Sequence, residues 1–192
     1  MKPDRLNALT DGVVAIVLTI MVLELRFPEQ ATLAAVLKVL PLLAAYLLAF
    51  IYVAIYWNNH HHMMHATERV SGSILWANLH LLFWLSLLPF TTGWMGENHF
   101  ARWPTALYGV NLLCCAIAYF ILQQRILATE RPDGRLARAI GIDLKGKTSP
   151  LLYLLGIASA WLVAPWLGLA FFVAAPLLWL IPDRRIERIM EG

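Results

Sequence analysis

The sequence predicts an all-α integral membrane protein with six transmembrane helices in a single domain over residues 1–192. Three observations carry this prediction. Hydrophobic residues make up 60% of the chain and charged residues only 14%, and the mean hydropathy is +0.65. Apolar runs without charge recur along the chain, the first of them from Gly12 to Leu23. The basic residues gather in segments that six crossings would place on one side. Such a balance is typical of chains that cross a bilayer.

The apolar segments are separated by polar residues, prolines and glycines, which give the expected helix boundaries. The expected helices cover residues 6–25, 32–58, 70–91, 104–127, 150–164 and a last one that follows a tight connection at 165–168 and ends near 181. The run NNHHHMMH at residues 58–65 is expected to leave the second helix as part of a polar loop. The third helix is expected to close at Pro89-Phe90, and a long polar segment spans residues 123–149.

The distribution of Lys and Arg predicts how the chain crosses the membrane. With six spans, one side holds twelve basic residues and the other three, Arg26, Lys38 and Arg102. The twelve are Lys2, Arg5, Arg69, Arg125, Arg131, Arg135, Arg138, Lys145, Lys147, Arg184, Arg185 and Arg188. Cytoplasmic loops carry the excess of basic residues, so we expect both termini in the cytoplasm and the protein in the cell's inner (plasma) membrane. The formal net charge of +3 is too small to indicate nucleic-acid binding.

The first apolar segment has two different faces when it is drawn as a helix. At about 100° per residue, Ile16, Ile20 and Leu23 fall within about 60° of one another, with Thr19 at the border. Asp11 points about 140° away from Ile16. Taken alone, the apolar stripe fits a lipid-facing or core surface better than a pore lining. A carboxylate at this depth is costly in lipid and therefore calls for partners.

Polar residues on other segments could supply those partners. Asn78 and His60 are expected at the same depth as Arg5 and Asp11, where they would form a helix-packing network or, alternatively, a proton or ion relay. Glu24 is expected at headgroup level, either as a solvated charge or as part of an acidic ring at a pore mouth.

Histidines and loop motifs complete the search for chemistry. His60, His61, His62 and His65 form a cluster that fits hydrogen bonding at the membrane interface better than a metal site, because no Cys lies near and the close acid is Glu68. His80 stands alone inside the third segment, where hydrogen bonding to a neighbouring helix is the usual role. The chain contains no GxxxxGK[ST], GxGxxG or TVGYG sequence, so a potassium filter made of carbonyl groups is not expected.

The first half of the chain resembles the transmembrane protein 175 potassium channels. The first helix of that family carries R-x-x-x-F-S-D followed by A-I-x-x-T. Here these positions are filled by Arg5, Leu9, Thr10 and Asp11 and then by Ala15, Ile16 and Thr19. The run WNNHH from Trp57, Asn78, and Pro89-Phe90 also agree, so the resemblance covers residues 5 to about 92. Leu9 and Thr10 replace the usual Phe and Ser but keep an apolar residue followed by a hydroxyl.

The resemblance implies a homotetramer whose first helices line a central pore. It places the pore constriction at Ile16, Ile20 and Leu23, and a contribution to potassium preference at Thr19. It implies that Arg5, Thr10 and Asp11 are held by His60 and Asn78. The expected function is a potassium-permeable cation channel, not an enzyme, with no cofactor and with potassium and other monovalent cations as the permeant species. Two alternatives stay open, a proton-coupled carrier using Asp11, His80 and Glu24, and a metal-handling protein built on the cluster at residues 60–65.

Overall fold

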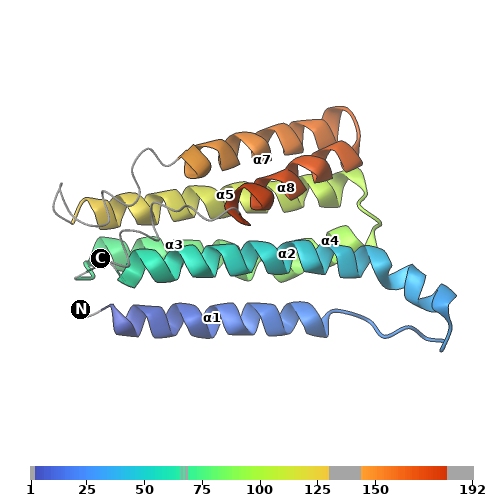
Figure 1. The fold of residues 1–192 in the computed structure, drawn as a ribbon, viewed down its shortest axis with the longest axis horizontal. Coiled ribbons are helices and arrows are strands. Elements are labelled where there is room, and N and C mark those ends of the chain that lie inside the picture. The colour runs from blue at the N-terminus through green and yellow to red at the C-terminus, as the bar shows by residue number, and fades with distance from the viewer. Residues whose placement is uncertain (1–2, 66, 68, 130–143, 181–192) are drawn as a thin grey trace.

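The computed structural model of the chain is a bundle of α-helices (Figure 1). It describes residues 3–65, 67, 69–129 and 144–180. The helices are α1 (Asp4–Leu23), α2 (Leu33–His65), α3 (Gly72–Ser86), α4 (Leu88–Glu97), α5 (Arg102–Leu127), α7 (Leu144–Leu162) and α8 (Pro165–Leu180). Successive helices run back and forth along the bundle, with α4 continuing in the direction of α3 (Figure 1).

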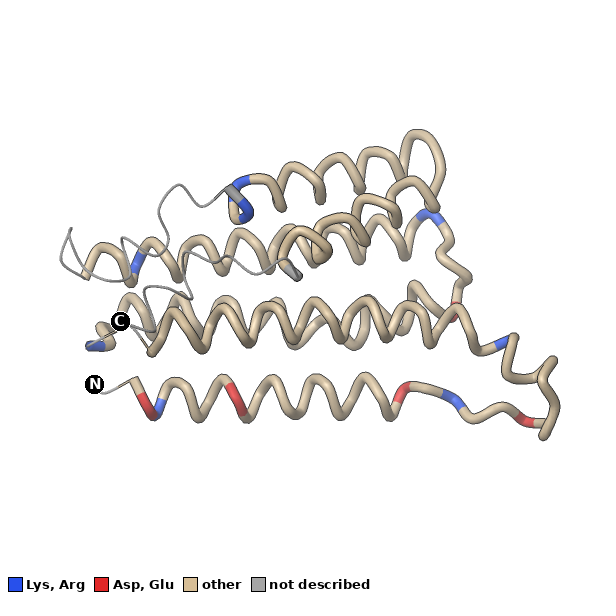
Figure 2. The backbone as a smooth tube through the Cα atoms, in the orientation of Figure 1, with Lys and Arg blue, Asp and Glu red and all other residues tan. Residues whose placement is uncertain are grey.

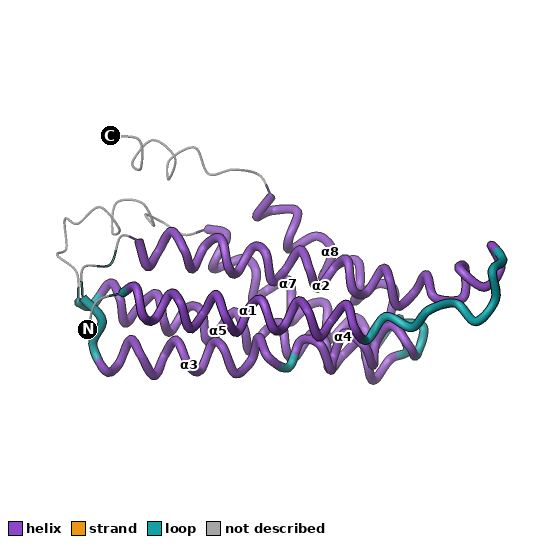
Figure 3. Tube along the Cα trace, turned by 90° about the horizontal axis from the view of Figure 1, so that it is seen from below, coloured by secondary structure: helices purple, strands orange, loops and turns teal. Residues whose placement is uncertain are grey.

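Helix α1 lies at one edge of the bundle. It packs on α2, α3 and α4, whereas α7 and α8 pack on α5 at the opposite edge (Figure 1; Figure 3 views the bundle from the side of α1). Its buried residues recur every three or four positions, as expected for one face of a helix: Leu6, Thr10, Val14, Val17 and Met21. Most of the other residues of α1 are exposed in the protomer.

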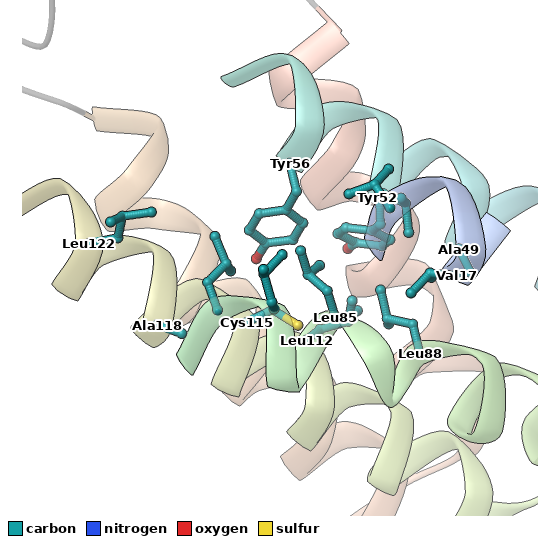
Figure 4. Packing of buried hydrophobic residues seen from close by; sticks show 14 of the residues in the cluster. Val17, Ala49, Tyr52, Tyr56, Leu85, Leu88, Leu112, Cys115, Ala118 and Leu122 are labelled. Atoms are coloured by element: carbon teal, nitrogen blue, oxygen red, sulfur yellow. The ribbon is translucent and has the colours of Figure 1, made fainter. Parts of the chain in front are cut away.

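The core between the helices is apolar and tightly packed. Figure 4 shows Tyr52 and Tyr56 of α2 meeting Leu85 of α3, Leu88 of α4 and Leu112 of α5. Small residues let helices approach closely, as is common where helices associate in membranes. A Cβ added at Gly96 of α4 would lie 2.7 Å from the Leu42 Cα of α2, so only glycine fits at this contact.

Four segments are long and apolar enough to cross a membrane. They are Asp4–Leu23, Leu33–His65, Gly72–Glu97 and Arg102–Leu127. The third combines α3 and α4, which are separated by a break at Leu87. Pro89 lies in the first turn of α4 and has no N–H to donate to the preceding turn, which explains the break. Helix α8 is a shorter apolar helix, and α7 begins with a polar turn that contains Lys145 and Lys147.

Several expected helix boundaries were wrong. Residues 58–65 are not a loop but the last two turns of α2. The third segment does not close at Pro89-Phe90 but continues as α4 to Glu97. Helix α7 begins at Leu144 rather than near Pro150, and α8 begins directly at Pro165 instead of after a connection at 165–168. Pro165 stands at the first position of α8, where helices tolerate proline, whereas Pro150 lies inside α7, where it removes a backbone hydrogen bond.

Charged residues lie towards the two ends of the bundle, as Figure 2 shows. By the helix bounds, the end that holds the N-terminus carries Arg5, Arg69, Arg125, Lys145 and Lys147, and the other end carries Arg26, Lys38 and Arg102. Asp11 is set inward from the first end, two turns after Asp4. Of the twelve basic residues expected on one side, Lys2, Arg131, Arg135, Arg138, Arg184, Arg185 and Arg188 fall outside the described residues.

Candidate functional site: the two faces of α1

A chain of hydrogen bonds joins α1, α2 and α3 inside the bundle. His60 Nε2 lies 2.7 Å from Asn78 Oδ1, Asn78 Nδ2 donates to Thr10 Oγ1 at 3.1 Å, and Thr10 Oγ1 donates to the Leu6 carbonyl at 3.1 Å. Because an amide oxygen only accepts, His60 must carry its proton on Nε2. The three side chains are at most 3% exposed. Each polar group therefore replaces water with a partner from another helix or from the backbone.

Asp11 lies outside this chain of hydrogen bonds. Its Oδ1 accepts a hydrogen bond of 2.8 Å from Trp57 Nε1, and the carboxylate is exposed at the surface of the protomer. His60 and Asn78 were expected to bind Asp11. Instead they bind each other, and Asn78 also binds Thr10. The contact from Trp57 was not predicted from the sequence. Its signal is the three-residue spacing from Trp57 to His60, which places both side chains at similar depth on α2.

Arg5 lies in the first turn of α1 and is exposed. The described residues provide it with no hydrogen bond or ion pair, so the structure does not bring it together with the other polar residues of the motif. Asp11 and Thr10 thus anchor α1 to α2 and α3 through two separate contacts, one at the surface and one in the interior.

The opposite face of α1 carries the residues expected at a pore constriction. Ile16 is 60% exposed, Ile20 is 42% exposed and Leu23 is 76% exposed in the protomer. Thr19 is exposed between them, and its hydroxyl donates to the Ala15 carbonyl at 2.7 Å. That bond uses the one hydroxyl proton and leaves lone pairs on the oxygen facing outward. This face can therefore offer rings of large apolar side chains and a weakly polar layer to whatever lies against α1.

The residues of the carrier alternative are far apart or paired elsewhere. Glu24 follows Asp11 by thirteen positions on one helix, which is about 20 Å along the axis. His80 is exposed on α3 and accepts a hydrogen bond of 2.9 Å from Trp84 Nε1. Asp11, His80 and Glu24 therefore do not form one continuous proton path within the protomer.

The histidines at the end of α2 divide between the interior and the surface. His60 binds Asn78, while the His61 ring stacks between Trp57, at a centroid distance of 5.8 Å, and His65, at 6.3 Å. Within the described residues, no group of three or more His, Cys, Asp or Glu side chains is placed to hold a metal ion. The residues present thus offer aromatic stacking rather than a coordination sphere.

Comparison with known proteins links this geometry to one family. The family model described as "Endosomal/lysosomal potassium channel TMEM175" matches residues 5–89. The chain is 49% identical over 191 residues to a protein named as a potassium channel from Chryseobacterium sp. (strain P1-3), covering 100% of this chain and 99% of the relative. It is 27% identical over 187 residues to another protein named as a potassium channel, from Chamaesiphon minutus, covering 90% and 92%.

A solved structure resembles the whole bundle. It is described as the crystal structure of a lysosomal potassium-selective channel TMEM175 homolog from Chamaesiphon minutus. It superposes with a TM-score of 0.82 at 25% sequence identity and covers 93% of this chain and 96% of that one. The likeness therefore includes α5, α7 and α8, which lie beyond the stretch matched by the family model.

Proposed function

Since this chain belongs to the TMEM175 family of potassium channels, we propose that it is a potassium-permeable channel in which α1 lines the ion pathway. The family is one of ion channels, so the chain is not an enzyme, and it is a multi-pass membrane protein. The observation that carries the proposal is the exposed face of α1. Large apolar residues and Thr19 face outward there while the opposite face is bound to the bundle.

The proposed assembly is a homotetramer of six-span subunits around a central pore. The spans would be α1, α2, α3 with α4, α5, α7 and α8. The position of α1 at the edge of the bundle supports this arrangement, because an edge helix can meet its copies around an axis. Asp11 supports it too. A carboxylate facing lipid is costly, and a neighbouring subunit would reduce that cost by covering it.

In the proposed gate, four copies of Ile16, Ile20 and Leu23 form three rings. Such rings cannot replace the hydration shell of an ion, so a narrow ring blocks current by excluding water. The Thr19 hydroxyls would supply weak oxygen contacts to a passing potassium ion. Selectivity over sodium is then expected to be modest, because one layer of hydroxyls replaces hydration less well than stacked carbonyl rings do. Other monovalent cations would also pass, and no cofactor is needed.

The proposed role of the polar residues is to hold α1 at a fixed depth and rotation. Thr10, Asn78 and His60 fix the inner face, and Asp11 with Trp57 fixes the helix from the side. Arg5 would act at the membrane surface, where it is exposed. With α1 held in this way, Ile16 is kept on the face that is opposite to the bundle.

The proposed orientation places both termini in the cytoplasm and the protein in the cell's inner membrane. Among the described residues, the end with the N-terminus carries five basic residues and the other end three. The excess of Lys and Arg on the cytoplasmic side of membrane proteins supports this direction.

The first test is a current measurement on the Ile16→Asn variant. A polar ring is wetted more easily than an isoleucine ring, so we expect the resting potassium conductance of the reconstituted protein to rise several-fold. The control is Val22→Asn, because Val22 is also exposed but lies about 120° from Ile16 on the wheel. Unchanged current in Ile16→Asn, or an equal rise in both variants, would reject Ile16 as the constriction.

The reconstituted protein in a planar bilayer also tests the function itself. With potassium on one side and sodium on the other, a channel gives discrete steps and a reversal potential shifted towards that of potassium. Slow, saturable flux that needs a proton gradient would instead favour the carrier.

A further inference from the structure

Glu24 continues α1 beyond the last residue of the proposed pore face. Its backbone is still helical, with φ −73° and ψ −12°, and its N–H donates to the Ile20 carbonyl. The helical wheel therefore applies to it and places it about 40° from Ile20 and about 80° from Ile16. The side chain is exposed, and the last turn of α1 contains no basic residue. Glu24 thus lies between the exposed stripe and the buried face of α1, about 20° from Val17 on the wheel, with its side chain exposed one residue after Leu23.

Two features make this end of α1 negative. The carbonyl groups of the last turn point out of the helix end and act as about half a negative charge. The carboxylate of Glu24 adds a full one. The described residues offer Glu24 no ion pair that would cancel its charge.

The nearest basic side chain along the chain is held elsewhere. Arg26 Nη2 lies 3.0 Å from Glu97 Oε1, at the end of α4. The two side chains are 78% and 42% exposed, so this pair contributes little to stability. Its effect is on position, because it directs the guanidinium towards α4 and satisfies its charge there.

We propose that Glu24 determines conductance by concentrating cations at the outer mouth of the pore, and that Glu97 is a positioning residue that keeps Arg26 from cancelling this charge. The inference rests on the proposed function, since only assembly around an axis brings four Glu24 carboxylates to one mouth. Charges of one sign in a confined entrance raise the local concentration of counter-ions by about tenfold or more. The effect depends on ionic strength, because the screening length falls from about 30 Å at 10 mM salt to about 3 Å at 1 M.

The test is the single-channel potassium conductance of Glu24→Gln, measured for current entering from the outer side. At about 10 mM potassium we expect a decrease of about twofold or more, and at about 1 M we expect conductance close to that of the parent protein, because salt screens the ring. The control is Glu29→Gln, which removes the same charge from the α1–α2 loop, outside the helix. It should leave the conductance nearly unchanged at both concentrations.

The role of Glu97 is tested by a second pair of variants. Glu97→Gln releases Arg26 and should also lower the conductance at low salt, although Glu97 lies on α4. Adding Arg26→Gln to that variant should restore the conductance. A structural defect at the end of α4 would not be repaired in this way.

The outcomes separate this inference from the proposed function. Parent protein that carries no potassium current would reject both. A normal parent current with equal conductance in Glu24→Gln at low salt would reject the inference alone. A decrease that persists unchanged at about 1 M salt would also reject it, because an electrostatic effect must be screened there.

Discussion

Replacing Asn78 by Leu tests whether the buried hydrogen bonds hold α1 in place. Asn78 is fully buried and joins His60 of α2 to Thr10 of α1. Leucine has a similar size, so the change removes polar partners with little change in packed volume. It leaves the His60 Nε2–H without its acceptor, while Thr10 keeps its donation to the Leu6 carbonyl and loses only an accepted bond.

The expected cost follows from these two losses. An unsatisfied buried donor costs about 1–3 kcal/mol, and the lost bond to Thr10 adds about 0.5–1.5 kcal/mol. Hydrogen bonds between membrane helices average about 0.6 kcal/mol in double-mutant cycles, so the loss of two such bonds sets a lower end of about 1 kcal/mol. We therefore expect Asn78→Leu to lower the free energy of unfolding by about 1–4 kcal/mol. A loss of 2 kcal/mol would lower the melting temperature by about 4–8 °C in a chain of this length.

The assay is thermal unfolding in detergent micelles, followed by tryptophan fluorescence. The matched control is Asn111→Leu on α5. Asn111 is also buried, but it donates only to Thr91 Oγ1 and its Oδ1 has no partner among the described residues. Its replacement removes one bond together with one unsatisfied oxygen, so we expect a loss below about 1 kcal/mol.

A double-mutant cycle with Thr10→Val locates the effect. Each single change breaks the Asn78–Thr10 bond, so the combined cost should be less than the sum of the two, by about 0.5 kcal/mol or more. The reasoning is refuted if the costs simply add, or if Asn78→Leu melts no lower than Asn111→Leu.

Two further substitutions test the hydrogen bond between Trp57 and Asp11 and the close contact between α4 and α2. Trp57→Phe removes the N–H that binds Asp11, so we expect at least about half of the assembled protein to be lost in size-exclusion chromatography. The control is Trp76→Phe, because Trp76 of α3 is also exposed but forms no such bond with the described residues. It should assemble normally, and equal yields would contradict the anchoring role. Gly96→Ala places a Cβ 2.7 Å from an α2 Cα and should cost about 1–3 kcal/mol in thermal unfolding. Gly93→Ala should be neutral or slightly stabilising, because an added Cβ there meets no described residue within 4 Å apart from the backbone of its own helix. The packing argument fails if both variants melt alike.

The faces of α1 could be predicted from sequence because one period governs the whole helix. The stripe of Ile16, Ile20 and Leu23 that the wheel predicts is exposed in the structure, and Thr10 lies on the buried side. What the wheel could not assign is the partner of each polar group. Asp11 and Thr10 are adjacent in sequence and therefore about 100° apart on the helix, which sends one to Trp57 at the surface and the other to Asn78 inside.

The choice of partners depends on how neighbouring helices are rotated, and a single sequence does not encode that rotation locally. The ion pair from Arg26 to Glu97 is another example. Its two residues belong to segments that were expected to be loops, and the pair exists because α4 continues to Glu97 and so comes close to the end of α1. Boundary errors of a few residues thus hide contacts between segments, even where the helices themselves are predicted correctly.

The end of α2 shows why composition misplaced a boundary. The run from Asn58 to His65 is polar. When each segment is assigned either to a helix in lipid or to a loop in water, a polar run is assigned to the loop. Within a bundle the same run has a buried side, formed by His60, Met63 and Met64 at the spacing of a helix face. His61 and His65 stack four residues apart on the outside. The methionine pair three and four residues after His60 was therefore the signal for two more helical turns. Because α2 continues through those turns, Met63 and Met64 lie beside His60 on the buried side, and Trp57 lies inside the helix rather than at its end.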